Sequence, residues 1–196
     1  MELTQAIRTR RSRHLLTAPA PSDTQFTDLV RTAASAPDHG TLRPWRWLLL
    51  RGTARHVLGD ALAAQATDGN GHRLRDKPLR APLLASIIFC PHEEATRVPA
   101  WEQLAATTLL VHSVELLLHD AGWGSIWRTG GAVEAPAVRE ALHIGADERL
   151  LGWLYVGTPD GRSSPPARTL PSVRERVTSL SGRHPRRQGG AAPGRR

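Results

Sequence analysis

The ten residues Gly122-Trp-Gly-Ser-Ile-Trp-Arg-Thr-Gly-Gly131 are the stretch that most constrains the fold and function of this 196-residue chain. They combine four glycines, two tryptophans and one arginine. Glycine lets the backbone approach a ligand closely, and arginine presents a fork of donors that matches a phosphate or a polarised carbonyl. The stretch therefore suits a flat, anionic ligand. A helix-ending glycine followed by a buried strand explains the same residues equally well.

The elements on either side of this stretch are predicted from the spacing of apolar residues. Trp101 to Ala121 carries almost no charge between Glu102 and Glu115 and keeps helical spacing. This pattern predicts a central, mostly buried helix, which Gly122 ends. Ser125 to Arg128 is predicted to be a short strand.

Seven further elements are expected in the rest of the chain. They are a helix from about Glu2 to Arg10, a helix begun by a Ser22/Gln25 capping box, a strand from Trp45 to Arg51, a helix after Gly52 with Val57 on its apolar face, a buried strand from Leu83 to Cys90, a short helix from Pro136 and a strand from Leu150 to Val156. The polar segment from Thr67 to Lys77 predicts a mobile connection. Because several connections are too short for regular crossovers, the pattern favours an α+β fold with a mixed sheet flanked by helices.

The positive charge of the chain is concentrated at its C-terminal end. The formal net charge is +8, and residues 160–196 contribute +7 of it in a Pro/Gly/Arg-rich tail. Such a tail has little to bury, so we expect one domain over residues 1–160 and a basic tail over 161–196 whose end is disordered. The tail predicts weak, salt-sensitive adhesion to polyanions and no specific nucleic-acid site.

Three features of the sequence favour a cytoplasmic location. No apolar run approaches the roughly 20 residues that span a bilayer, so no membrane contact is expected. The N-terminus lacks a basic segment followed by an apolar one. Cys90 is the only cysteine, which excludes an intrachain disulfide and fits a reducing compartment.

Several catalytic classes are disfavoured because their motifs are missing. There is no G-x-S-x-G elbow, and Cys90 follows a core strand, where an inert thiol is expected. The nine histidines form no H-x-x-x-H pair, and Cys90-Pro-His92-Glu93-Glu94 is only a weak metal-like cluster, so no metal site is predicted. Trp127 stands where a dinucleotide-binding fingerprint requires its third glycine.

Arginines near both ends of the expected domain are the remaining candidates for a binding site. Arg10, Arg11, Ser12 and Arg128 could neutralise a phosphate dianion, while the glycine-tryptophan stretch could lie along a flat ring. Flavin mononucleotide (FMN) meets both demands and brings its own hydride chemistry at N5, so no catalytic side chain is required. Arginine near a helix C-terminus also complements the helix dipole, which is a structural alternative for Arg10 and Arg11.

Five blocks of sequence occur in a characteristic order. They are Ala6-Ile-Arg-Thr-Arg-Arg-Ser12, Ala36-Pro-Asp-His-Gly-Thr-Leu-Arg-Pro-Trp45, Val98-Pro-Ala-Trp-Glu-Gln103, Ala121-Gly-Trp-Gly-Ser-Ile-Trp-Arg-Thr-Gly130 and Leu151-Gly-Trp-Leu-Tyr-Val-Gly-Thr-Pro159. Together they resemble the short single-domain branch of the FMN-dependent NAD(P)H nitroreductase family. The resemblance covers about residues 1–160 and leaves out the tail.

The resemblance implies a three-layer α+β homodimer with two FMN sites at the subunit interface. By the resemblance, the FMN phosphate and the polar edge of its ring are bound by Arg10, Arg11 and Ser12. The resemblance also implies that the flavin of the partner subunit is contacted by Pro37, Asp38 and His39. The segment beside the flavin is then Trp127, Arg128 and Thr129. A histidine in a polar loop is otherwise usually solvated. The implied activity is a ping-pong transfer of hydride from NADH or NADPH through flavin N5 to a nitroaromatic, quinone or similar small acceptor.

Some positions depart from the family pattern. Thr41 and Arg43 stand where many members have Asn and Gln, and His14 stands where many have a lysine near flavin N1 and O2, for which Arg13 could substitute. Other members use a C-terminal arginine for the phosphate, and here Arg168 and Arg174 are both candidates. Two alternative functions stay open: a specialised flavoenzyme that oxidises or fragments one metabolite, and a non-catalytic flavin-binding or polyanion-tethered protein.

Overall fold

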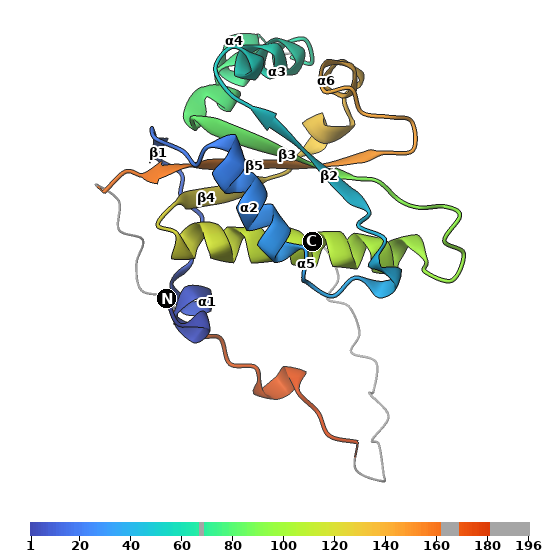
Figure 1. Ribbon diagram of the computed structural model, residues 1–196. Helices are drawn as coiled ribbons and strands as arrows, with labels where there is room; N and C mark the ends of the chain where they lie inside the picture. Colours follow the sequence, from blue (N-terminus) through green and yellow to red (C-terminus); the bar gives the residue numbers. More distant parts are fainter. Residues whose placement is uncertain (67–68, 162–168, 181–196) are drawn as a thin grey trace, which may run out of the picture. The chain divides into compact units, whose positions relative to one another are not determined.

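A computed structural model describes residues 1–66, 69–161 and 169–180 of the chain. The chain divides into a compact unit, Met1–Pro166, and a second unit, Ala167–Arg196, in whose described part a short 3-10 turn, η4 (Arg174–Arg176), is found. The end of the predicted tail, residues 181–196, lies outside the described residues. The account below concerns the first unit, which holds the sheet and its helices (Figure 1).

The sheet has five strands, and the longest of them organises the other four. The strands are β1 (Leu16–Thr17), β2 (Trp45–Leu50), β3 (Leu83–Phe89), β4 (Gly124–Arg128) and β5 (Arg149–Pro159). β5 pairs with β1, β3 and β4, and β3 pairs with β2. All these pairings are antiparallel, and an isolated parallel bridge joins Ser12 to Ser125. The predicted α+β class is confirmed, and the mixed character of the sheet is limited to this bridge.

Helices cover both faces of the sheet. They are α1 (Leu3–Thr9), α2 (Asp23–Ala33), α3 (Ala54–Ala63), α4 (Gly71–Arg75), α5 (Ala100–Asp120) and α6 (Pro136–Ala141), with 3-10 turns η1 (His39–Thr41), η2 (Lys77–Arg80) and η3 (Gly131–Glu134). Figure 1 shows α3, α4 and α6 on one side of the sheet and α2 and α5 on the other. The three layers expected from the family resemblance are therefore present.

The buried strand β3 shows why two helical layers are needed. All seven of its residues are buried, and five of them are divided between two apolar clusters, one on each face. Leu84 and Ile88 pack with α3 and α6, whereas Leu83 and Ile87 pack with α2 and α5. Successive side chains of a strand point to opposite faces, so a strand that is apolar at every position except Ser86 must be covered on both.

Local signals placed most helix ends correctly. Ser22 and Gln25 form the predicted capping box of α2, and Gly122, with φ of 83°, follows the end of α5 as expected. One expectation was wrong, because Val57 is 53% exposed although it was expected on the apolar face of α3. The segment predicted to be a mobile connection contains a short helix, α4, which packs against α3. In the described part of the chain, no helix is long and apolar enough to cross a membrane.

Candidate functional site

Two of the predicted site segments lie side by side along one edge of the sheet. The backbone N–H of Arg13 donates to the carbonyl of Ser125 at 2.9 Å, next to the Ser12–Ser125 bridge. Further along β4, Arg128 Nη2 lies 3.1 Å from His14 Nδ1. The structure therefore brings the segment from Arg10 to Ser12 next to β4, which leads into Trp127 to Thr129.

Glycines make this close arrangement of backbones possible. A side chain at Gly124 would lie 2.7 Å from Leu16 Cδ2, and one at Gly152 would overlap the carbonyl oxygen of Arg128. Gly152 also has φ of 116°, a region that other residues rarely adopt. The glycine-rich composition around β4 is thus a requirement of its packing as well as of any ligand.

Arg10 occupies a buried and incompletely satisfied position. Its Nη1 lies 3.6 Å from Glu115 Oε1 on α5, and the two side chains are only 18% and 11% exposed. Nη1 is buried without a hydrogen-bond partner. Burial raises the pKa of Glu115, while the charges of Arg10 and His112 oppose that rise. The guanidinium therefore keeps an unused donor beside a weakly matched carboxylate.

A cavity of about 280 Å³ adjoins Arg10 and is rich in cationic side chains. Arg11, Arg13 and His119 also line it, together with Gly122 to Ser125. Burial and the charges of Arg10, Arg13 and Arg11 lower the pKa of His119, although Asp120 acts in the opposite direction. The electrostatic environment of this cavity favours an anion.

Arg11 and Ser12 differ from Arg10 in what they contact. Arg11 Nη1 donates to the carbonyls of Arg8 and Arg10 at 2.6 and 2.9 Å, so in this structure it satisfies the C-terminal end of α1. This is the structural alternative raised by the sequence. Ser12 contributes its backbone to the bridge with Ser125.

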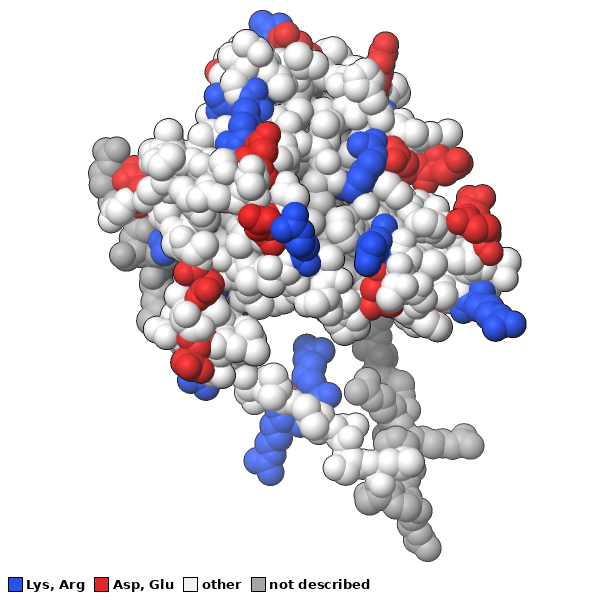
Figure 2. All heavy atoms as spheres, in the orientation of Figure 1, with Lys and Arg blue, Asp and Glu red and all other residues white. Residues whose placement is uncertain are grey.

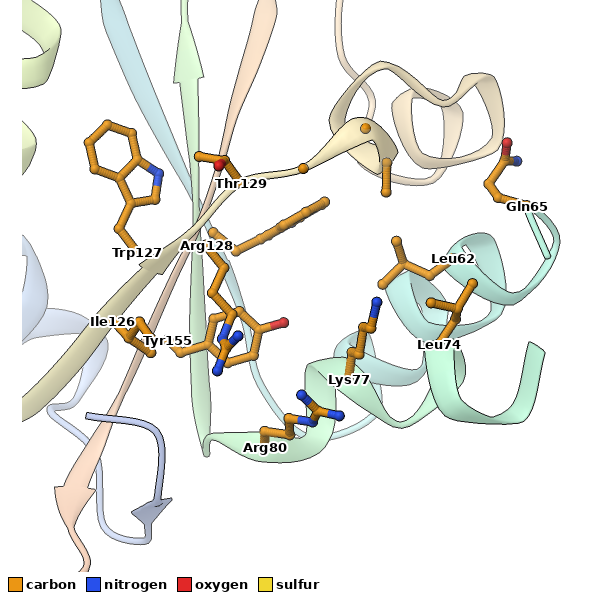
Figure 3. A pocket seen from close by; sticks show the side chains of 14 residues that line it. Leu62, Gln65, Leu74, Lys77, Arg80, Ile126, Trp127, Arg128, Thr129 and Tyr155 are labelled. Carbon is orange, nitrogen blue, oxygen red and sulfur yellow. The ribbon is translucent and has the colours of Figure 1, made fainter. Parts of the chain in front are cut away.

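The segment Trp127 to Thr129 lines a second, larger cavity of about 430 Å³ (Figure 3). Trp127 Nε1 donates to the carbonyl of Leu151 at 3.0 Å, which fixes the indole. The guanidinium of Arg128 lies 5.5 Å from the centre of the Tyr155 ring, within the range of a cation–π interaction. Burial raises the pKa of Tyr155, and Arg128 and Arg80 oppose that rise. Arg128 Nε is a second buried donor without a partner.

Two further cations line this cavity that sequence reasoning did not select. Lys77 and Arg80 come from η2, on the opposite wall from β4 (Figure 3). Nothing local distinguishes them from surface charges, because the cavity is created by the packing of η2 against the sheet.

The predicted loop Pro37 to His39 has its own internal structure. The Asp38 carboxylate accepts from the N–H groups of Leu42 and Arg43 at 3.3 and 2.7 Å. These bonds stabilise a loop in which Thr41 and Arg43 have positive φ values of 52° and 50°. Asp38 is therefore an organiser of the loop.

His39 is directed toward the start of α5. Its Nδ1 lies 2.8 Å from Glu102 Oε2, and its side chain is 65% exposed. Arg10 contacts Glu115, which is 13 residues further along the same helix, a separation of about 20 Å at roughly 1.5 Å per residue. One chain therefore does not bring His39 to Arg10.

The remaining candidates are also placed by the structure. Burial, followed by the contact with Glu148, raises the pKa of Cys90 to about 11, which disfavours a reactive thiolate, as expected. Arg174 belongs to the second unit, and Arg168 lies outside the described residues. Among the described residues no group of three His, Cys, Asp or Glu side chains could hold a metal ion.

Comparisons with known proteins agree with the geometry. Residues 7–158 match the model of the nitroreductase family. YdjA of Escherichia coli (strain K12), which carries a provisional NAD(P)H nitroreductase name, is 32% identical over 169 residues that cover 84% of this chain and 92% of YdjA. The crystal structure of a nitroreductase-like family protein from Bacillus cereus superposes with a TM-score of 0.82 at 25% identity, covering 93% of this chain and 97% of that one.

A second solved structure supports the fold at lower identity. The FMN and NADPH-dependent nitroreductase NfnB from sphigopyxis sp. strain HMH superposes with a TM-score of 0.73 and is 20% identical, with 92% of this chain and 100% of that chain covered. At this identity the likeness concerns the fold.

Proposed function

This chain belongs to the nitroreductase family, and from that premise we propose that it is an FMN-dependent oxidoreductase that uses NADH or NADPH to reduce a small acceptor. The acceptor class is a nitroaromatic, a quinone or a similar compound. The relatives support the oxidoreductase class by name, and NfnB supports FMN in a protein of the same fold. With its single cysteine the chain fits a cytoplasmic enzyme.

The observation that carries this proposal is a pair of buried donors without acceptors. Arg10 Nη1 and Arg128 Nε each lack a hydrogen-bond partner, and they belong to the two segments that lie along β4. Buried polar groups are nearly always satisfied in folded proteins, so these two unpaired guanidinium nitrogens, which belong to residues lining different cavities beside β4, favour an extended anionic ligand. FMN, which carries a phosphate and a polar ring edge, supplies acceptors for both.

The residues of this chain have distinct tasks toward the cofactor. Arg10 and the backbone around Ser12 bind the phosphate and the adjacent polar groups, and Arg128 holds positive charge near the ring edge. The backbone after Trp127 supplies N–H donors. When bound, FMN itself accepts and donates the hydride at N5. Fixed positive charge and donors in a partly buried site favour the reduced, anionic form of the cofactor.

We further propose that two copies of the chain form each site. His39 and its loop lie far from Arg10 within one chain, so a second copy is required if both contact the same flavin. Large apolar side chains are exposed on the outer surfaces of α5 and α1: Trp101 by 69%, Leu109 by 46%, Leu3 by 68% and Ile7 by 51%. In Figure 2 the charged groups on the visible face are separated by wide uncharged areas. Such surfaces are typical of homodimer interfaces.

Visible absorption spectroscopy tests the proposed cofactor and the first half-reaction. The purified protein is mixed with FMN, desalted, and then treated with NADH or NADPH without oxygen. We expect flavin bands to stay with the protein and to bleach on addition of one of the nicotinamides. Loss of all flavin on desalting would instead favour the non-catalytic alternative.

A further inference from the structure

The larger cavity beside β4 contains more positive charge than the flavin-binding assignment uses. Lys77, Arg80 and Arg128 line it, and no aspartate or glutamate does (Figure 3). Arg128 is committed to His14, Tyr155 and the proposed flavin site. Lys77 and Arg80 come from a different element, η2, and have no ion-pair partner among the described residues.

Apart from Gln65 and Thr129, the rest of the cavity wall is largely apolar. Leu62 and Leu74 form the side beneath α3 and α4, and Trp153 and Tyr155 form the floor on β5. In Figure 3 the Lys77 ammonium group and the Tyr155 hydroxyl point into the space between these walls. The cavity therefore pairs an apolar surface with cations at one end, which is the complement of a small organic anion.

Surface lysines and arginines are usually no more than solvated charges. Lys77 and Arg80 are exposed, but both line one cavity together with Arg128 and several large apolar side chains, and this shared placement carries the argument. A volume of about 430 Å³ is large enough for a substituted aromatic ring. A second hollow of about 410 Å³ shares Arg80 and Arg128 with this cavity and is also lined by Asp160. Positive charge focused in a cleft raises the local concentration of anions.

We propose that this cavity binds the anionic group of the electron acceptor, a carboxylate or a phosphate monoester on a compact apolar body. Lys77 and Arg80 are then specificity-determining residues, because they bind the charged group while the reducible part of the acceptor faces the flavin. This inference rests on the proposed oxidoreductase function and adds to it the class of acceptor.

A pair of acceptors that differ in charge tests the proposal. The FMN-loaded enzyme is assayed with 4-nitrobenzoate and 4-nitrobenzamide, and the ratio of their kcat/KM values is compared between wild type, Lys77→Met, Arg80→Met and the double variant. Using the ratio cancels differences in enzyme content and in flavin loading. We expect each single variant to lower the benzoate-to-benzamide ratio about 5-fold, or ~1 kcal/mol, and the double variant about 20-fold, or ~1.8 kcal/mol.

Arg73→Met is the matched control, because it removes the same charge from the neighbouring helix α4 at a residue that does not line the cavity. It should leave the ratio within twofold of wild type. An equal fall in Arg73→Met would show that only the overall charge matters and would overturn the proposal.

Two further measurements test whether Lys77 and Arg80 bind FMN or the nicotinamide cosubstrate instead of the acceptor. If Lys77→Met and Arg80→Met instead raised the FMN dissociation constant tenfold, the cations would serve the flavin. If they raised KM for NADPH but not for NADH, they would serve the nicotinamide cosubstrate. Either result would overturn the assignment to the acceptor.

A binding measurement keeps this test independent of turnover. Calorimetric titration of the protein with benzoate and with benzamide should show tighter binding of benzoate, and the preference should disappear in the double variant. Absence of flavin retention would contradict the proposed function, whereas equal affinity for benzoate and benzamide would contradict the anion site. The two failures are therefore distinguishable.

Discussion

Two arginine–glutamate pairs in this molecule differ in how completely they satisfy each other. Arg46 Nε and Nη2 each lie 2.6 Å from a Glu148 oxygen, and Glu148 also accepts from the N–H of Gly145 at 2.8 Å. Arg10 and Glu115 are more deeply buried, yet their closest atoms are 3.6 Å apart. The contact with Arg46 lowers the pKa of Glu148 to about 2, whereas burial raises that of Glu115.

The difference separates a structural pair from a binding pair. The Arg46–Glu148 contact connects β2 to the segment before β5 and is complete without any ligand. A buried charged group with an unpaired hydrogen-bond donor destabilises the fold, and such a group is expected where a bound ligand accepts that hydrogen bond. We therefore expect substitutions in the first pair to change stability and substitutions in the second to change FMN affinity.

Replacing Arg10 should have the largest effect. Arg10→Ala removes the charge assigned to the phosphate, so the FMN dissociation constant should rise about 100-fold, equivalent to ~2.7 kcal/mol. Fluorescence titration of FMN measures this change. Arg8→Ala is the control, since it removes an exposed charge from the same helix. Wild-type FMN affinity in Arg10→Ala would remove the difference between the two pairs.

Replacing Glu148 should affect the stability of the fold and leave the cofactor alone. Glu148→Gln should lower the free energy of unfolding at pH 7 by about 2 kcal/mol, because the glutamine is neutral and its single amide oxygen replaces only one of the two carboxylate acceptors of Arg46. Denaturant titration checks this, and FMN affinity should stay within twofold of wild type.

The pH dependence of this pair has a defined sign. Because the folded pKa of Glu148 is about 2 and its usual value is 4.5, the stabilisation is complete above pH 4.5 and is lost as the pH falls toward 2. The difference in unfolding free energy between wild type and Glu148→Gln should therefore shrink over that interval. A constant difference from pH 7 to pH 2 would contradict the assignment.

His39 belongs to a third ion pair, which is exposed. Its substitution should change FMN affinity without changing the stability of the fold. Because exposed pairs contribute little, His39→Ala should change the free energy of unfolding by less than about 0.5 kcal/mol. If its loop contacts the partner's flavin, the FMN dissociation constant should nevertheless rise about tenfold, or ~1.4 kcal/mol. A variant with both values unchanged would show that His39 is only a solvated loop residue.

Replacing Glu115 should change FMN affinity less than replacing Arg10 or His39 does, and with the opposite sign. Glu115→Gln removes the carboxylate that competes with phosphate for Arg10, so the FMN dissociation constant should fall about fivefold, or ~1 kcal/mol. The raised pKa of Glu115 stabilises the fold at low pH, and this contribution is lost as the pH rises through that value. Glu115→Gln should abolish that part of the pH dependence in denaturant titrations, and weaker FMN binding would contradict competition.

The sequence was sufficient for features that depend on neighbouring residues. The capping box at Ser22, the fully buried strand β3 and the helix α5 with its terminal Gly122 all follow from local patterns, and the structure confirms them. The five ordered blocks led to the family, which residues 7–158 confirm. The prediction that Arg10 and Arg128 share an anion site came from their residue types and then from the resemblance, and the structure adds that their segments lie along β4.

Features that depend on distant contacts were missed. The two-residue strand β1 exists because Leu16 and Thr17 pair with the end of β5, about 140 residues later. The short helix α4 is polar and forms against α3. Glu115 and Lys77 have no distinguishing local pattern, because one is defined by its partner on α1 and the other by a cavity wall built from separate elements.

Mixed dimers test the central claim, a flavin site built from two chains, most directly. Arg10→Ala and His39→Ala chains carrying different affinity tags are co-expressed, and the mixed dimers are isolated and titrated with FMN. If one site takes Arg10 from one chain and His39 from its partner, each mixed dimer has one intact site and should bind one FMN with wild-type affinity, although neither parent variant does. If both residues act within one chain, every site carries a defect, and no site of wild-type affinity will appear.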